Sequence, residues 1–298
     1  MPIAPLVPPP VGVQAASVIV IDDASGKVLW SRDPDTPRYP ASTTKIMTGL
    51  LLAERTKPGE IVVAPPGVKG VTPSIMNLKP GEKLSSNDLL AGMMLRSAND
   101  GCVAAAVHVS GSVPAFVELM NAKARELGLV RTHFRNPNGL PNSYHVSTAR
   151  DLATLGRFAL RNERFAAIVR MPSKKIARSI VGRDTLMTNR NRWLKKDPTA
   201  IGIKTGWTTA SRNTYVGAVQ RDFRMVDAIL RTEGWVDDHA ALVKWTYANW
   251  TAGKRYRAGE IVGETLAEGG ASPVPVTPME DATIEALRQA VIRAGDEA

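Results

Sequence analysis

The pattern of hydrophobic positions predicts strands at both ends of the chain with helices between them. Residues 16–22 (ASVIVID) and 27–31 (KVLWS) flank a Ser-Gly-Lys turn, which is typical of a β-hairpin. Three further strands are predicted in succession, at residues 199–207, 213–220 and 224–231. Because these strands come from distant segments, we expect one antiparallel sheet covered by helices, an α/β (α+β) fold.

The middle of the chain has helical periodicity. After Ser42, the apolar residues Ile46, Met47, Leu50 and Leu51 recur at i, i+3 and i+4, which predicts a helix that begins at this serine. Residues 85–111 predict a helix, a break near Ser97, and a second helix. Further helices are predicted at 113–128, 147–160 and 237–250, and short strands with turns at 59–68 and 78–84.

Composition at the two ends suggests three parts. Residues 1–12 are Pro-rich and predict an extended lead-in, and residues 13–252 form the main domain. Residues 253–298 predict a short β-like C-terminal appendage, shortened or truncated, that ends in a modest amphipathic helix over 280–295. That helix fits a packing role better than a membrane-surface anchor, because it has no aromatic residue; membrane-surface association stays open.

Charge and composition narrow the classes of function. The 298 residues are 44% hydrophobic and carry a formal charge of +10, which suits an anionic partner such as nucleic acid, a membrane surface or a cell-wall polymer. The Lys and Arg residues are scattered, which argues against nucleic acid. No apolar run is long enough to span a membrane, and the N-terminus lacks the pattern of a secretory signal peptide.

The single Cys102 cannot form an intrachain disulfide, and its Ala/Val-rich surroundings predict a buried thiol. The four histidines, at positions 108, 133, 145 and 239, have no metal-ligand spacing. We therefore predict structural or surface roles for them, no metal site and no cofactor.

Three motifs in a fixed order carry the candidate chemistry. They are Ser42-Thr43-Thr44-Lys45, Ser97-Ala98-Asn99 and Lys204-Thr205-Gly206. Each alone is weak, since a capped helix, a helix break or a turn would explain it. Together they supply what is needed to open an amide bond through an acyl-serine, and they match the motif set of penicillin-interacting serine enzymes.

The residue types suggest roles in that reaction. Ser42 and Lys45 share a helix face, so Lys45 can act as the base if burial and the cation Lys204 lower its pKa. Ser97 can pass a proton to the leaving amine. Asn99 can hold the substrate's amide and tether Lys45.

The third motif predicts substrate binding on an edge strand. Lys204 and Thr205 suit a free carboxylate, and Gly206 leaves room for close backbone approach. The backbone amide of Trp207, together with that of Ser42, could form an oxyanion hole.

Longer segments show the same order of motifs. The chain resembles a low-molecular-mass penicillin-binding protein of the D-alanyl-D-alanine carboxypeptidase family (peptidase family S11) over about residues 14–250. The matching segments are IDDASGKVLW, PASTTKIMT, LRSANDG, FRNPNGLP, STARDLA, NRN and GIKTG. The resemblance implies the transpeptidase-like fold, which serine β-lactamases share, with a helical subdomain, and it makes residues 13–252 the catalytic domain.

The resemblance also implies an activity and a place. The expected reaction is removal of the terminal D-Ala from peptidoglycan stem peptides outside the cytoplasmic membrane, with β-lactams as covalent inhibitors. By position, Ser42 is the nucleophile and Lys45 the base, Ser97 and Asn99 form the second motif, and Lys204 and Thr205 hold the carboxylate. A looser alignment adds Arg231 as a further carboxylate ligand. Trp207 departs from the His or Tyr of many relatives, which puts the shape of the pocket in question.

Three alternatives remain open at this stage. A D,D-endopeptidase of the same family is hardly separable by sequence. A class A β-lactamase would need a carboxylate on the loop between the second and third motifs, but the glutamates between Asn99 and Lys204, at positions 118, 126 and 163, lie outside NPNGLP. A non-catalytic wall-binding protein would have no need of all the motif residues.

Overall fold

The computed structural model describes residues 8–251, 255–256, 263–266, 273–276 and 282–283. The chain divides into two compact units, Met1–Asn249 and Trp250–Ala298. The first unit contains every residue of the three sequence motifs, so the site is built within it.

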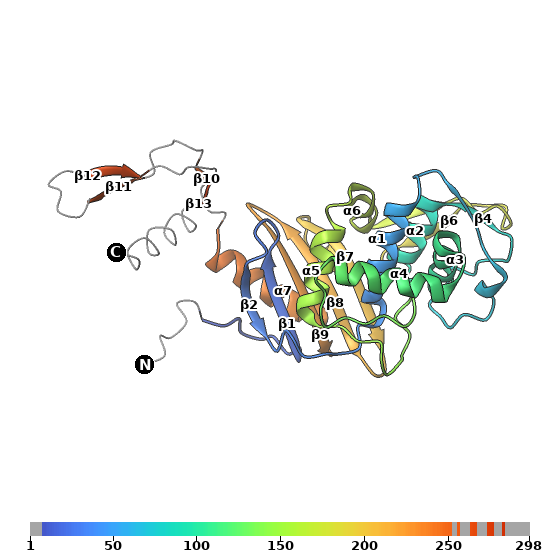
Figure 1. Ribbon diagram of the computed structural model, residues 1–298, viewed down its shortest axis with the longest axis horizontal. Coiled ribbons are helices and arrows are strands. Elements are labelled where there is room, and N and C mark those ends of the chain that lie inside the picture. Colours follow the sequence, from blue (N-terminus) through green and yellow to red (C-terminus); the bar gives the residue numbers. More distant parts are fainter. Residues whose placement is uncertain (1–7, 252–254, 257–262, 267–272, 277–281, 284–298) are drawn as a thin grey trace. The chain divides into compact units, whose positions relative to one another are not determined.

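A five-stranded antiparallel sheet forms the centre of the first unit (Figure 1). Its strands, in spatial order, are β2 (Val28–Arg32), β1 (Ser17–Asp22), β9 (Arg224–Thr232), β8 (Arg212–Gln220) and β7 (Ala200–Thr208). N-terminal β1 pairs with C-terminal β9, with Val18 opposite Ile229. The prediction of one sheet from distant segments is confirmed, and the third sequence motif lies on the edge strand β7.

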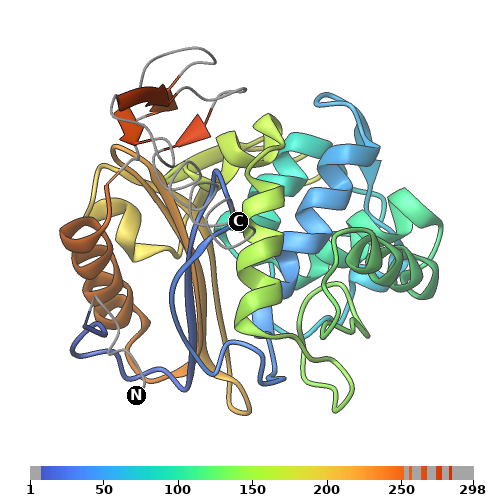
Figure 2. The ribbon, with the colours of Figure 1, turned by 60° about the vertical axis from the view of Figure 1, so that its left-hand side comes forward.

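Helices cover both faces of this sheet. Side chains alternate along β8, so Val216 and Ala218 enter one hydrophobic cluster while Tyr215 and Val219 enter another. Helix α5 (Ala149–Ala159) packs on the first face and α7 (Trp235–Asn249) on the second (Figure 2). A buried hydrophobic cluster on each face thus holds the sheet that carries the third sequence motif on its edge strand.

The helical subdomain surrounds α1 (Lys45–Arg55), which is buried on all sides from Lys45 to Ala53. Its neighbours are α2 (Ser86–Leu95), α3 (Asn99–Ser110), α4 (Val113–Glu126), α5 and α6 (Glu163–Val169). Each fully buried Ile or Leu of α1 contributes about 1.5–3 kcal/mol relative to an exposed side chain. The sequence pattern predicted one apolar face, whereas the helix is the centre of the subdomain.

Polar side chains define where the helices begin. Ser85, Ser112, Thr148 and Asn162 each accept a hydrogen bond from the backbone N–H three residues later, at the start of α2, α4, α5 and α6. Each such cap is worth about 1 kcal/mol. These caps explain why the predicted helix boundaries agree with the structure to within a few residues.

Small elements complete the first unit. They are the hairpins β3 (Ile61–Val63)–β4 (Lys83–Ser85) and β5 (Ser173–Ile176)–β6 (Thr185–Thr188), and the 3₁₀ turns η1 (Ala41–Thr44), η2 (Pro66–Val68) and η3 (Arg192–Lys195). Elements α6, β5 and β6 were not predicted from the sequence. The predicted helix start at Ser42 is corrected slightly, since Ser42 lies in η1 and the α-helix begins at Lys45.

The C-terminal unit is described through four short strands. They are β10 (Arg255–Tyr256), which pairs with β13 (Ala282–Thr283), and β11 (Gly263–Leu266), which pairs with β12 (Pro273–Val276). The helix expected at 280–295 lies outside the described residues, apart from the two residues of β13. The lead-in expected at residues 1–12 is described only from Pro8 onward.

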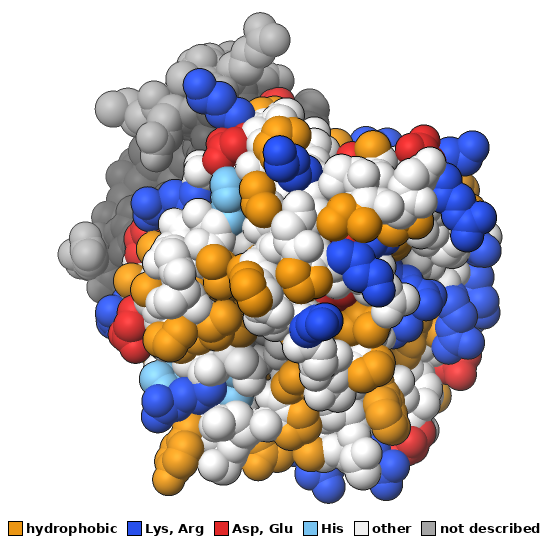
Figure 3. All heavy atoms as spheres, turned by 90° about the vertical axis from the view of Figure 1, so that its right-hand side faces the viewer, with side chains coloured by type: hydrophobic (Ala, Val, Ile, Leu, Met, Phe, Trp, Pro, Cys, Tyr) orange, Lys and Arg blue, Asp and Glu red, His pale blue; other side chains and the backbone are white. Residues whose placement is uncertain are grey.

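Two surface properties bear on possible partners. Figure 3 shows Lys and Arg side chains spread over one face of the molecule among uncharged ones, not gathered in a single stripe. Within the described residues no single helix is long and apolar enough to cross a bilayer; α3 and α4 would pass only as a pair, and they are bent by 83°.

Candidate active site

Ser42 lines a cavity of about 660 Å³, and its side chain contacts the buried Lys45. Lys45 Nζ lies 2.9 Å from Ser42 Oγ, because the 3₁₀ turn η1 runs directly into α1 and places the two side chains on one face. Ala41, just before the serine, has a left-handed φ of 48°. A non-glycine residue in this region is strained, and such strain is common where a side chain must be held for function.

The Lys45 amine is fully buried, and this changes its acid–base properties. The pKa of Lys45 is lowered from 10.5 to about 8, mainly by burial, and the nearby Arg190 guanidinium contributes to this lowering. At neutral pH roughly one Lys45 amine in ten is then unprotonated, compared with fewer than one in a thousand at the ordinary pKa. An unprotonated amine 2.9 Å from a serine hydroxyl can accept its proton.

The NPNGLP loop supplies the other anchor of this lysine. Lys45 Nζ donates to the backbone carbonyl of Asn138 at 2.6 Å, and Thr48 Oγ1 donates to that of Pro137 at 2.6 Å. Gly139 has a φ of +83°, and a Cβ there would collide with the Ala41 carbonyl. The loop therefore lies so close to the serine turn that only glycine fits at position 139.

His145 attaches the far end of this loop to the serine turn. Its Nδ1 accepts from the Arg135 backbone N–H at 3.1 Å, so Nε2 carries the proton and donates to Thr44 Oγ1 at 2.9 Å. Burial lowers the pKa of His145 to about 4, with a contribution from His133, which keeps the ring neutral at neutral pH. His145 thus has a structural role within the site: it joins the Thr44 side chain to the backbone at Arg135.

The second motif organises the opposite wall. Ser97 lines the cavity with a left-handed φ of 66° in the break between α2 and α3. Asn99 Nδ2 donates to the Thr72 carbonyl at 2.7 Å, and its backbone N–H donates to the Ser74 carbonyl at 2.7 Å. The expectation that Asn99 tethers Lys45 is therefore wrong in this structure: Asn138 does so, and Asn99 holds residues 72–74.

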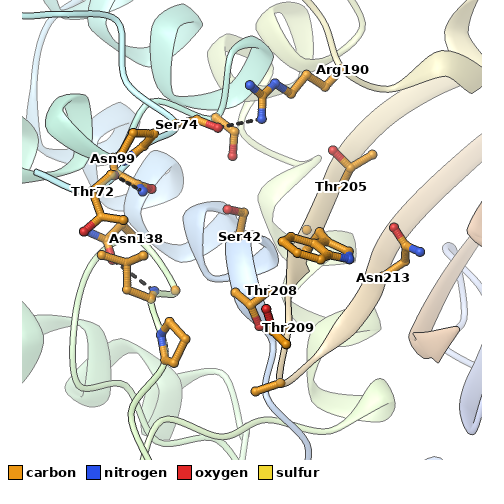
Figure 4. A pocket seen from close by; sticks show the side chains of 18 of the residues that line it. Ser42, Thr72, Ser74, Asn99, Asn138, Arg190, Thr205, Thr208, Thr209 and Asn213 are labelled. Atoms are coloured by element: carbon orange, nitrogen blue, oxygen red, sulfur yellow. Dashed lines mark hydrogen bonds between the residues drawn. The ribbon is translucent and has the colours of Figure 1, made fainter. Parts of the chain in front are cut away.

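The third motif lies along β7, beside the serine turn. Thr205, Gly206 and Trp207 all line the cavity, and Trp207 is 61% exposed. A Cβ on Gly206 would lie 2.8 Å from the backbone nitrogen of Ser42, so only glycine lets the strand lie against that amide. Figure 4 shows Ser42 between Thr205 on one side and Asn99 and Asn138 on the other.

Lys204 occupies a different position from the one expected. It is 1% exposed, does not line the cavity, and donates from Nζ to the Thr205 carbonyl at 2.9 Å. Burial, followed by the charges of Lys45 and Arg190, holds the pKa of Lys204 well below its ordinary value. Lys204 and Lys45 are thus close enough to interact electrostatically, but Lys204 acts from beneath the cavity wall.

Arg190 is a cation that lines the cavity and that sequence reasoning did not assign. Its Nη1 donates to Ser74 Oγ at 2.6 Å, and its backbone N–H donates to the Leu95 carbonyl at 3.1 Å (Figure 4). The flanking Asn189 donates from Nδ2 to the backbone carbonyls of Val169 and Met171. Asn191, on the other side, accepts at Oδ1 from the backbone N–H of Trp193. In the segment NRN, the two asparagines thus fix the backbone on either side of Arg190, which lines the cavity.

Arg231, by contrast, does not line this cavity. It lies at the end of β9 and lines a second, smaller cavity with Arg38. The structure thus brings together Ser42, Lys45, Ser97, Asn99, Thr205, Gly206 and Trp207, with Lys204 behind them, and it leaves Arg231 apart. Among the described residues that line the Ser42 cavity, none is an Asp or Glu.

Other lining residues could not be found from the motifs. They are Thr72 and Ser74 in a loop, Asn213 near the start of β8 and Trp235 at the start of α7, and these places carry no distinctive sequence pattern. Asn138 and Arg190 do lie in segments that resemble the family, NPNGLP and NRN. Their roles depend on a backbone carbonyl and on side-chain direction, which a sequence does not display.

Comparisons with known proteins agree with this geometry. The profile of the family described as D-alanyl-D-alanine carboxypeptidase, Peptidase_S11, matches residues 5–233. A curated relative, the D-alanyl-D-alanine carboxypeptidase DacB2 of Mycobacterium tuberculosis, is 36% identical over 243 residues, which cover 78% of this chain and 82% of the relative.

Solved structures show the same fold. The crystal structure of a D-alanyl-D-alanine carboxypeptidase from M. tuberculosis H37Rv superposes with a TM-score of 0.77 at 35% identity, covering 82% of this chain and 94% of that one. The Streptomyces K15 DD-transpeptidase gives 0.73 at 25% identity, with 81% and 97% covered. The transpeptidase-like fold expected from the resemblance is confirmed, and the chain belongs to the D-alanyl-D-alanine carboxypeptidase family, peptidase S11.

Proposed function

We propose that this protein is a serine D,D-carboxypeptidase that removes the terminal D-Ala from peptidoglycan stem peptides through an acyl-serine at Ser42. The observation that carries the assignment is the 2.9 Å contact between Ser42 Oγ and the buried Lys45 amine, whose pKa is lowered to about 8. Membership of the S11 family gives the reaction class, and the residues that line the cavity support the roles proposed for them.

Acylation follows from the positions of these groups. Unprotonated Lys45 takes the proton of Ser42 Oγ as that oxygen attacks the carbonyl of the penultimate D-Ala. The backbone amides of Ser42 and Trp207 stabilise the oxyanion. Ser97 gives its proton to the nitrogen of the departing D-Ala as the peptide bond breaks, and the Lys45 ammonium returns the proton to Ser97. Water then hydrolyses the ester and restores the free serine.

Recognition of the chain terminus rests on positive charge. Thr205 and Arg190 face the same cavity, and a guanidinium with a hydroxyl suits a terminal carboxylate. Lys204 adds to the positive potential from beneath. Asn99 and the edge of β7 bind the backbone of the substrate, and the exposed Trp207 supplies an apolar wall.

A β-lactam presents a carboxylate and a strained amide to the same groups, so it acylates Ser42. Its leaving group stays attached to the ring-opened acyl group and obstructs the incoming water. No carboxylate lines the described cavity to activate a water in the manner of a class A β-lactamase, so we expect a long-lived adduct. Peptidoglycan stem peptides and β-lactams are the partners we propose, and the place of action is outside the cytoplasmic membrane.

The test combines a covalent label with a product assay. Wild-type protein is incubated with a labelled penicillin and, separately, with a peptide that ends in D-Ala-D-Ala. We expect one adduct per chain on Ser42 and release of free D-Ala, with both lost at least about a thousandfold in Ser42→Ala. Ser143→Ala, an exposed serine, is the matched control and should behave as wild type.

The same assay decides between the family's two peptidase activities. A cross-linked muropeptide dimer is offered beside the monomeric peptide, and terminal D-Ala is measured against newly separated stems. Release of terminal D-Ala as the main product supports the carboxypeptidase. Cleavage of the dimer alone would assign the D,D-endopeptidase activity instead. A well-folded protein with no adduct and no product would indicate a non-catalytic wall-binding protein.

A further inference from the structure

A second cavity of about 230 Å³ lies beside the active-site cavity. Its walls come from residues 37–39, Val146, residues 210–211 and Arg231. Ala210, in the turn between β7 and β8, lines both cavities, so this turn forms the partition between them. The second cavity therefore lies next to any molecule bound at Ser42, on the side of the turn that contains Ala210.

Arg231 is directed into this second cavity by a β-bulge. Asn213 pairs with Thr232 and Thr214 pairs with Leu230, so Arg231 is the one residue of β9 without a partner on β8. Its φ is 59°, a left-handed conformation that glycine would adopt without strain. A bulge redirects the side chain it carries, and a strained non-glycine residue at such a place points to a function for that side chain.

Arg38, which also lines this cavity, supplies a second guanidinium. Its Nε donates to the buried Ser17 Oγ at 2.6 Å, and its backbone pairs with Ser147 in both directions, so it is held in place. Burial lowers the pKa of Arg38, and the charge of Arg231 is the next largest cause, ahead of the opposing effect of Asp33. In the described part of the chain, neither arginine has a carboxylate within ion-pair distance.

We propose that Arg38 and Arg231 form a carboxylate-binding subsite, which takes an acidic side chain of the stem peptide while its D-Ala-D-Ala end occupies the Ser42 cavity. Two adjacent cations without an acidic partner favour an anion, and a guanidinium pair matches a carboxylate. Pro37, Tyr39 and Val146 add apolar wall for the methylene stem of such a side chain. The cavity is sized for a side chain and not for a polymer.

This inference rests on the proposed function and extends it to the choice among stem peptides. The experiment uses the full chain and two peptides of the same length that end in D-Ala-D-Ala. One carries a free side-chain carboxylate upstream of the scissile bond, and the other carries the corresponding side-chain amide. Release of D-Ala gives kcat/KM for each peptide.

We expect wild-type protein to prefer the free acid by about tenfold, and Arg231→Gly to lose this preference with little change on the amide. Glycine removes the charge and relieves the left-handed strain, so this variant is expected to fold. Arg212→Gly is the matched control: it removes an arginine with a φ of 57° from the same hairpin, but Arg212 lines neither cavity. It should keep the wild-type preference.

Each other outcome has a definite meaning. Equal rates on the two peptides with wild-type protein overturn the subsite but leave the proposed function standing, whereas absence of D-Ala release from both overturns the function itself. Equal loss on both peptides in Arg231→Gly, or slower labelling by penicillin, would mean that Arg231 positions the strand and binds no carboxylate.

Discussion

At the scale of single residues, the site depends on two buried amines: Lys45 contacts Ser42, and Lys204 lies behind the cavity wall. Lys45 and Lys204 are both almost inaccessible to solvent, and burial depresses the pKa of each. A charged ammonium in such a place is costly, so the protein keeps these lysines at the expense of stability. What it gains is a base that is partly unprotonated at neutral pH.

We expect acylation of Ser42 to depend on pH. Because the reactive form of Lys45 is the unprotonated amine and its pKa is about 8, acylation by labelled penicillin should rise about tenfold per pH unit below 8 and level off above it. The second-order rate constant, measured from pH 5.5 to 9, checks this. A rate constant that is flat across that range would exclude Lys45 as the base.

At the scale of elements, the loop at 136–141 packs tightly against the serine turn. Lys45 and Thr48 hold it from α1, and His145 holds its far end. Gly139 makes the contact possible, since a side chain there would meet the Ala41 carbonyl.

We therefore predict that Gly139→Ala lowers the free energy of unfolding by about 2 kcal/mol or more and slows acylation at least about a hundredfold. The loop must move away, and Lys45 then loses its carbonyl partner. Gly128→Ala is the control: it has a φ of +70°, but a Cβ there would meet nothing within 4 Å. Its cost should be about 1 kcal/mol, with acylation unchanged. Urea unfolding measures the loss of stability, and labelling by penicillin measures the rate of acylation. Equal acylation rates in the two variants would refute the role of the contact between Gly139 and Ala41.

Sequence patterns predicted these elements well where they had strong periodicity or capping residues. The five strands of the central sheet, α1 and the break at Ser97 are examples. Short elements such as α6 and β5–β6 were missed because seven or four residues do not show a period. The burial of Lys204 was not predicted, and Asn138 and Arg190 were not assigned, because their positions depend on packing and on the direction of backbone groups.

At the scale of the whole molecule, all residues that line the two cavities belong to the first compact unit. Its sheet has a hydrophobic cluster on each face, and its last helix, α7, is attached to β9 by the buried pair of His239 and Asp227, 3.0 Å apart. The unit has what a domain needs to fold by itself.

We predict that a chain ending after residue 251 folds and is acylated by labelled penicillin within about twofold of the full chain. Removing the C-terminal unit takes away no residue of either cavity. Thermal unfolding and labelling of the two chains side by side provide the measurement. Loss of labelling in a truncated chain with a normal unfolding transition would show that the C-terminal unit takes part in the chemistry.

The short contacts around Ser42 also determine when this chain becomes chemically competent during synthesis. The neighbours of the serine turn come from the loop at Asn138 and from Gly206 on β7, about a hundred and about a hundred and sixty residues farther along. β7 in turn needs β8 and β9 to join it to β1. A nascent chain still lacking those strands has an ordinary alcohol at position 42, so reactivity toward amides appears only once the domain has been translated almost to its end.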